Sequence, residues 1–269
     1  MLSRLLKWLL SAAVVLILCS GLIWWLAVPS AERISMAIER FAEKTDGLKV
    51  KIKGASKGIF YSIYADSVTL SYQGITLPSI RNIEVYANIS SIVRRKAVLL
   101  FTTKVLGGKM EGEVVFRKKT ADLALRVEKA SITELLNLAG LSGDGFMNIN
   151  GILSGPGGEF QVELTDLKLK PSGFASVLPV DRFQSLNGVL ILEGQSLNVK
   201  ALEIIGKDIR ARLKGLIKSG NLNLTLELFP NAKTVNENQF LLAGIEQYKR
   251  SPGHYSIPIK GSLSHPVIR

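Results

Sequence analysis

From residue 48 to the end of the chain, apolar and polar residues alternate in short runs, and this period of two constrains the fold more than any other feature. The runs lie at 48–53, 68–72, 83–89, 123–127, 160–164, 197–201, 209–213 and 222–228. Such alternation is typical of β-strands with one buried and one solvated face. Short gaps rich in Gly, Asn, Ser and Pro separate the runs, which favours antiparallel hairpins. We therefore predict a mainly β domain over 48–269, an elongated antiparallel sheet with a possible subdivision near 108.

The first 29 residues follow a different pattern, which predicts a transmembrane helix. No charged residue occurs from Trp8 to Val28, and these 21 residues would span about 31 Å as a helix. Aromatic residues stand at both ends of the stretch, and basic residues precede it, which favours a cytoplasmic N-terminus. We expect the membrane interface to be marked by Arg4, Lys7, Trp8, Trp24 and Trp25.

Two other interpretations of this segment are open. A cleaved signal peptide has an apolar region of about 7–15 residues, which is shorter than this one, and a small residue before its cleavage site. A lipoprotein acylated at Cys19 would need a small residue where Leu18 stands. We therefore expect an uncleaved anchor and a single-pass protein with its bulk outside the cytoplasm. The absence of thiols from the rest of the chain suits an oxidising compartment.

Residues 30–47 have helical periodicity and predict a short amphipathic helix. Ile34, Ile38 and Phe41 would share one apolar stripe, while Ser30 can cap the start and Gly47 can end the helix. Such a helix could pack on the domain that follows or lie on a lipid surface. The mixed signs of its polar face favour packing.

Two further helices and two turns are predicted within the β region. Ser131 and Glu134 have the spacing of a capping box before an apolar run and Gly140, and Thr234 and Glu237 repeat that spacing. Both segments would cover an end or one face of the sheet. The clearest turns are 155–158 and 219–221.

The sequence contains few of the residues on which catalysis depends. A single Cys excludes a disulfide framework, and His254 and His265 lack nearby carboxylate or thiolate partners for a metal, so we interpret them as surface or strand-edge residues. The glycine-rich stretch 140–145 follows a helical pattern and precedes a strand pattern, which predicts a turn and not a phosphate-binding loop. Several carboxylates occupy positions expected on the solvated sheet face, namely Glu111, Glu113, Glu163 and Glu193. We predict a protein that is not an enzyme, with no catalytic, metal or cofactor site and no cofactor.

The chain is basic, with 34 Lys and Arg residues against 22 Asp and Glu residues. Lysines recur at 49, 51, 53 and 57, and basic residues cluster at 94–96. Aromatic residues are not interleaved with them at stacking positions, so we predict no nucleic-acid partner. Anionic lipid head groups are the more natural partner, while solubilisation of exposed strands accounts for the same rows more simply.

The two ends of this pattern resemble a known family. The first is VPSAERISMAIERFAEKTDGLKVKIKGASKGIFYSIYADSVTLSY, and the second is the tail YKRSPGHYSIPIKGSLSHPVIR. The tail has a spaced motif formed by Gly253, Tyr255, Pro258, Gly261, Leu263 and Pro266. With these features the chain resembles AsmA-like bacterial envelope proteins and, among them, the general secretion pathway protein N family of type II secretion systems in its longer, AsmA-like form. One difference is that residues 58–61 read Gly-Ile-Phe-Tyr, where the enterobacterial branch has a Gly-Thr-Leu-Trp-like motif.

The resemblance implies a curved sheet, a location in the bacterial inner membrane, a bulk in the periplasm and no known catalysis. Two functions follow as expectations. The first is an accessory or assembly role in type II protein secretion, in which a sheet edge or face docks secretion-system proteins. The second is an AsmA-like lipid-binding or lipid-transfer module, in which an uncovered apolar face holds acyl chains. The alternatives differ in whether the apolar residues at 222–228, with Val162 and Leu164, face packed side chains or an open trough.

Overall fold

The protein is mainly β, with antiparallel pairing and few short helices, as the alternation predicts. The computed structural model describes residues 29–43, 48–58, 61–72, 75–88, 91, 97–117, 120–138, 140–172, 178–194, 196–232, 235, 243–262 and 265–268. These residues fall into two compact units, divided between Lys104 and Val105. The predicted membrane helix lies outside the described residues. Among the helices that are described, none has the length and apolarity needed to cross a membrane.

Among its described residues, the first unit has one helix and six strands. Its elements are α2 (Ala31–Glu43), β1 (Leu48–Lys53), β2 (Ser56–Lys57), β3 (Ser62–Tyr72), β4 (Ile75–Thr76), β5 (Ile80–Ala87) and β6 (Ala97–Val105), whose last residue belongs to the second unit. Strand β3 pairs with β1, β2, β4 and β5, always antiparallel. The buried Thr103 hydroxyl of β6 donates to the Arg81 carbonyl of β5 at 2.7 Å.

Helix α2 confirms the predicted helix, although it buries different residues from those expected. The Arg33 N–H lies 3.4 Å from Ser30 Oγ and 2.9 Å from the Ser30 carbonyl, so Ser30 caps the helix. The most deeply buried side chains of α2 are Ala31 and Ala42, each 5% exposed. Ile38, predicted on the buried stripe, is 47% exposed. Small residues replace large ones at the contact because they let the helix approach closely. The side chain of Phe41 and the predicted stop at Gly47 lie outside the described residues.

The second unit is an antiparallel succession of hairpins. Its strands are β7 (Gly108–Phe116), β8 (Ala121–Ser131), β9 (Ser142–Ser154), β10 (Gly157–Lys170), β11 (Phe183–Glu193), β12 (Ser196–Gly206), β13 (Ile209–Lys218), β14 (Asn221–Pro230), β15 (Lys249–Ser251), β16 (His254–Ser262) and β17 (His265–Ile268). Each strand from β7 to β14 pairs with the next one, and β16 then pairs with β14, β15 and β17. The short helices are α4 (Thr133–Leu138), η2 (Val180–Arg182) and η3 (Glu246–Tyr248). The helix predicted from Thr234 and Glu237 falls largely outside the described residues.

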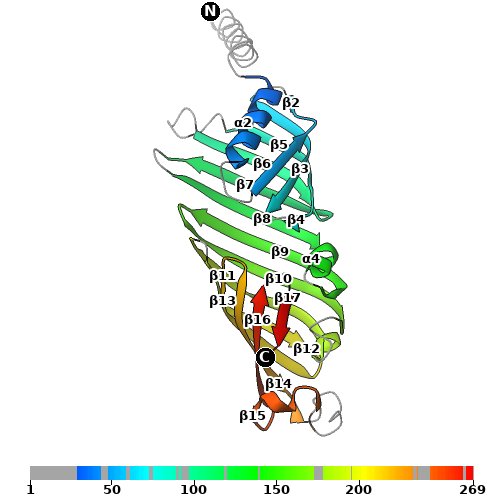
Figure 1. Cartoon of the computed structure of the whole chain (residues 1–269). Coiled ribbons are helices and arrows are strands. Elements are labelled where there is room, and N and C mark those ends of the chain that lie inside the picture. Colours follow the sequence, from blue (N-terminus) through cyan, green and yellow to red (C-terminus); the bar gives the residue numbers. More distant parts are fainter. Residues whose placement is uncertain are drawn as a thin grey trace, which may run out of the picture. The chain divides into compact units, whose positions relative to one another are not determined.

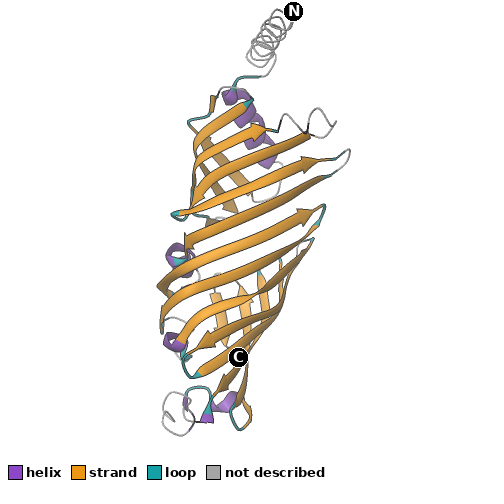
Figure 2. Cartoon of the chain, turned by 180° about the vertical axis from the view of Figure 1, so that it is seen from behind, coloured by secondary structure: helices purple, strands orange, loops and turns teal. Residues whose placement is uncertain are grey.

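The sheet of the second unit curls back on itself. In Figure 1 strands β16 and β17 lie in front of β10–β13, and in Figure 2 the same strands appear behind the sheet. Side chains of β11–β14 and β16 therefore meet in one core, which is closed by Leu178, Val180 and Ile245 from the connecting segments. This core contains Tyr255, Leu228, Ile245 and Ile257, each at most 1% exposed.

Turns and helix ends confirm several local predictions. Ser219 (φ 49°) and Gly220 (φ 77°) form a two-residue hairpin turn that brings Lys218 opposite Asn221. Gly140 (φ 71°) ends α4, where its N–H and that of Leu141 donate to the carbonyls of Asn137 and Leu136 at 3.1 and 2.8 Å. This pair of bonds is the Schellman pattern, which needs a residue with positive φ.

Two expectations about this region were wrong. Ser131 is the last residue of β8 and not the cap of α4: its Oγ lies 3.5 Å from the Thr133 N–H at the start of the helix and donates to Thr133 Oγ1 at 3.2 Å. The stretch 140–145 is not one turn, because β9 begins at Ser142. Gly143 and Gly145, both at φ 154°, are strand residues packed against the backbone of β10, where a Cβ would meet the carbonyls of Lys168 and Thr165.

A bulge changes one predicted strand face. The run 197–201 predicts Leu197, Val199 and Ala201 on the same face. The pairing of β12 with β13 shifts between Val199 and Leu202, so Leu202 enters the core at 9% exposure in place of Ala201.

Candidate functional site

The second unit has one continuous apolar sheet face, which we call the apolar face. One row across it consists of residues aligned by strand pairing, namely Val127, Ile149, Val162, Gly188, Leu202, Leu213, Leu226 and Ile257. The neighbouring row is Leu125, Gly151, Phe160, Leu190, Val199, Gly215, Leu224 and Ile259. Both rows contain only aliphatic residues, glycine and one aromatic ring. The face is therefore apolar along its whole width.

Burial along this face changes from one end to the other. On β12–β16 the face is a packed core, in which Val199, Leu226 and Ile257 are 3%, 5% and 0% exposed. On β8–β10 Val127 is buried as well, at 5% exposed, whereas Leu125, Ile149, Phe160 and Val162 are only half-buried. The difference arises because the curled strands β16 and β17 cover the core end. We call the half-buried end, from β7 to β10, the open end.

Glycine gives the open end a recess under an aromatic ring. Gly151 lies opposite Phe160, and a Cβ at Gly151 would come within 2.5 Å of Phe160 Cδ1. The ring therefore occupies the space that a side chain at position 151 would fill. Two aliphatic side chains, Leu125 and Leu190, flank this pair on the neighbouring strands.

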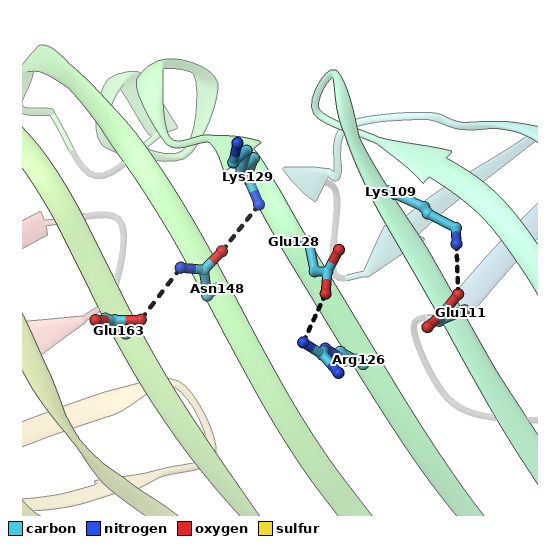
Figure 3. Close-up of polar contacts among 7 residues, drawn as sticks. All are labelled: Lys109, Glu111, Arg126, Glu128, Lys129, Asn148 and Glu163. Carbon is cyan, nitrogen blue, oxygen red and sulfur yellow. Dashed lines mark hydrogen bonds and ion pairs between the residues drawn. The ribbon is translucent and has the colours of Figure 1, made fainter.

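The opposite face of the same strands is polar. Figure 3 shows four contacts on adjacent strands: Lys109 with Glu111, Arg126 with Glu128, the Lys129 backbone N–H with the Asn148 side chain, and the Asn148 amide with Glu163. The first two are exposed ion pairs at 2.6 and 2.7 Å. Hydrogen bonding raises the pKa of Lys109 and lowers the pKa of Glu111, so both groups stay charged. The Glu163 carboxylate is exposed, as predicted, and it accepts a hydrogen bond from the Asn148 side-chain amide at 3.2 Å.

A hollow interrupts the polar face near the hairpin of β9 and β10. Its volume is about 680 Å³, and its lining includes Ala124, Ile152, Gly157, Glu159 and Ile191. Ile152 is 62% exposed. Two small residues in the lining, Ala124 and Gly157, leave the space beside this isoleucine. The signal for this surface in the sequence is Ile152, an apolar residue at an outward position of the alternation, and the sequence prediction did not include it.

A buried phenol joins an ion pair at the core end. Tyr255 is 1% exposed, and its hydroxyl donates to Glu246 Oε2 at 3.3 Å, while Lys249 Nζ lies 2.6 Å from Glu246 Oε1. Burial raises the pKa of Tyr255, and hydrogen bonding to Lys249 lowers the pKa of Glu246. The phenol is therefore a neutral hydrogen-bond donor that fixes η3 to β16.

The two histidines lie in different environments. His265 is exposed on β17, as predicted. His254 is half-buried at the start of β16, its ring stacks on Phe229 at 4.9 Å, and its Nε2 is buried without a hydrogen-bond partner among the described residues. No group of three or more His, Cys, Asp and Glu side chains that could hold a metal occurs in the described part of the chain.

The residues predicted at the membrane interface cannot be placed on this fold. Arg4, Lys7, Trp8, Trp24 and Trp25 all lie outside the described residues. The candidate site is therefore the apolar face with its open end, together with the hollow on the polar face. Comparison of the chain with protein-family models, curated proteins and solved structures found no match.

Proposed function

We propose that the chain is a non-enzymatic, AsmA-like protein of the bacterial envelope that holds acyl chains against the open end of its apolar face. The observation that carries this proposal is a difference in burial between two residues of one row. Val162 and Leu226 occupy the same row, yet Leu226 lies in a packed core and Val162 is only half-buried. An extended hydrocarbon chain fits this surface because the row contains no polar side chain.

The proposed protein is attached to the inner membrane by its first 29 residues, with its N-terminus in the cytoplasm and its β units in the periplasm. The support for this attachment is the uncharged stretch from Trp8 to Val28.

Site-specific photocrosslinking in cells tests the acyl-chain proposal. A photoreactive amino acid replaces Val162 on the apolar face or, as a matched control, Gln161 on the polar face of the same strand. We expect phospholipid adducts at position 162 and few at position 161, detected by mass spectrometry of the purified protein. Equal adduct yields at both positions, or none at 162, would refute acyl-chain binding.

The second candidate function is docking of type II secretion proteins, and the hollow beside Ile152 supports it. An isoleucine that is 62% exposed beside a hollow of about 680 Å³ is a surface that an apolar side chain of another protein can fill. Docking by strand addition has less support, since β17 has four residues and contains Pro266.

Secretion measurements test the docking function. We expect Ile152→Arg to lower secretion of a type II substrate and crosslinking to the secretion machinery. Ile205→Arg is the matched control, because Ile205 is also exposed, at 44%, on β12 away from the hollow. Normal secretion by the Ile152→Arg protein at wild-type abundance would rule out docking at this hollow.

A further inference from the structure

The positive charge of the chain is concentrated in its first unit. Residues 29–104 contain twelve Lys and Arg residues against six Asp and Glu residues, an excess of six. Residues 105–269, more than twice as many, contain twenty against sixteen, an excess of four. A charge imbalance of this kind indicates the part of a protein that meets an anionic partner.

Strand β1 contributes three lysines to one face of this unit. Lys49, Lys51 and Lys53 are all exposed and alternate with half-buried Val50 and Ile52. Alternate residues on a strand lie about 7 Å apart on the same side, so the three ammonium groups form a row. We call the surface formed by Lys49, Lys51 and Lys53 the lysine face.

The residues paired with the lysine face are neutral. Strand β3 places Ser71, Thr69 and Ser67 opposite Lys49, Lys51 and Lys53, respectively. On its other side, Ser67 pairs with the exposed Arg81 of strand β5, which is another cation. The nearest carboxylate along β3, Asp66, lies beside Gly54. None of the three lysine side chains makes a hydrogen bond or ion pair within the described part of the chain.

Basic residues of the second unit are arranged differently. On its polar face Lys109 lies against Glu111, Arg212 against Glu203 and Lys214 against Glu227, at 2.6, 3.3 and 2.8 Å. There the strands place a carboxylate beside each of these cations. Like charges about 7 Å apart on one face of a strand repel each other. An anionic partner would relieve the repulsion between the three lysines of the lysine face.

We propose that the lysine face binds the surface of a membrane that contains anionic phospholipids. The inference rests on the proposed anchor, because α2 begins at Ala31, just after the proposed anchor, and contacts β1, so the first unit would lie near the bilayer. Electrostatic attraction falls off within about 8 Å at physiological ionic strength, so it acts only on residues held close to the head groups. Each lysine near such a surface strengthens binding about five-fold.

Lysine labelling of the full chain tests this proposal. The protein is reconstituted with vesicles of phosphatidylcholine alone or with vesicles that also contain phosphatidylglycerol. A water-soluble amine-reactive reagent then labels exposed lysines, and mass spectrometry gives the labelling rate at each position. We expect Lys49, Lys51 and Lys53 to react at least five-fold more slowly with the anionic vesicles, and high salt to restore their rates. Lys168, Lys170 and Lys218, which are exposed lysines of the second unit, should react equally with both vesicles.

Flotation of vesicles with bound protein separates this proposal from the anchor on which it rests. Flotation with both kinds of vesicle and no lipid-dependent protection of the three lysines would leave the anchor standing and overturn the lysine face. Flotation with anionic vesicles alone, abolished by high salt and by the combined variant Lys49→Gln, Lys51→Gln and Lys53→Gln, would support the lysine face and refute the anchor. The matched variant Lys168→Gln, Lys170→Gln and Lys218→Gln should float like the wild type. Flotation with neither kind of vesicle would overturn both proposals, and equal protection by a DNA oligomer without lipid would assign the face to nucleic acid instead.

Discussion

Glu39 Oε1 in α2 accepts a hydrogen bond from the backbone N–H of Ile52 in β1 at 2.7 Å. This N–H is therefore bonded to the helix and is not available to another strand. Strand β1 pairs with β3, and an unprotected sheet edge invites pairing with another chain. The helix that follows the predicted membrane segment thus protects the first strand of the sheet.

Removing this bond should loosen β1. We expect Glu39→Ala to lower the free energy of unfolding by about 1–3 kcal/mol, because a hydrogen bond to a charged group is lost and the Ile52 N–H is left unpaired. Glu39→Gln keeps a carbonyl acceptor and should cost less. Hydrogen exchange at Ile52 measures the effect locally. Glu43→Ala, at an exposed position of the same helix, is the control, and equal exchange rates in the two alanine variants would contradict the role of Glu39.

The two ends of the apolar face should respond differently to the same substitution. Leu228→Ala should cost about 2–5 kcal/mol, since Leu228 is 0% exposed and its removal leaves a cavity. Leu125→Ala at the half-buried open end should cost about 1 kcal/mol, because solvent already reaches this residue. Denaturant unfolding of both variants gives the comparison. Similar losses would show that the open end is as well covered as the core end.

The contact between Gly151 and Phe160 should appear in a double-mutant cycle. Gly151→Ala places a Cβ within 2.5 Å of the Phe160 ring and should cost about 1–3 kcal/mol. When Phe160→Ala has already removed the ring, the added Cβ should cost much less. Unfolding free energies of the wild type, both single variants and the double variant measure this coupling. Additive effects would mean that the ring does not occupy the recess above Gly151.

The ion pair at the core end should make stability depend on acid pH. Hydrogen bonding to Lys249 lowers the pKa of Glu246 below 4.5 in the folded protein. A carboxylate with a lower pKa in the folded state stabilises the fold above its unfolded pKa, and the contribution disappears as pH falls through the folded-state value. We therefore expect Glu246→Gln to lose less stability than the wild type between about pH 5 and pH 3.

Urea unfolding across this pH range measures the difference. Glu193→Gln, which changes an exposed carboxylate of β11, is the control and should keep the acid dependence of the wild type. An unchanged acid dependence in Glu246→Gln would show that the contact with Lys249 does not contribute to folding.

The sequence predicted local structure where a single residue type or a short pattern decides it. The alternation at 222–228 predicts a strand with one apolar face, and β14 buries Leu224, Leu226 and Leu228 on that face. Gly140 and Gly220 mark a helix end and a turn because their positive φ values suit a residue without a side chain. These features depend on neighbours within a few residues, so the sequence contains the information.

Bulges could not be predicted in the same way. Lys129 (φ 51°) and Asp166 (φ 53°) adopt a left-handed conformation inside β8 and β10, at places where the strand pairing shifts. Neither residue type requires that conformation, and cross-strand pairing selects it. The position of Leu202 in the core, where alternation predicts Ala201, has the same cause.

The sequence by itself determined that this chain forms antiparallel strands with an apolar face, because a period of two places every second side chain on the same side of a strand. Only the tertiary structure decided which part of that face is covered. Val162 and Leu226 look alike in the sequence, and strand pairing puts them in one row. Leu226 is buried because the sheet curls over it, whereas Val162 is half-buried, and the curl depends on long-range pairing that no local pattern encodes.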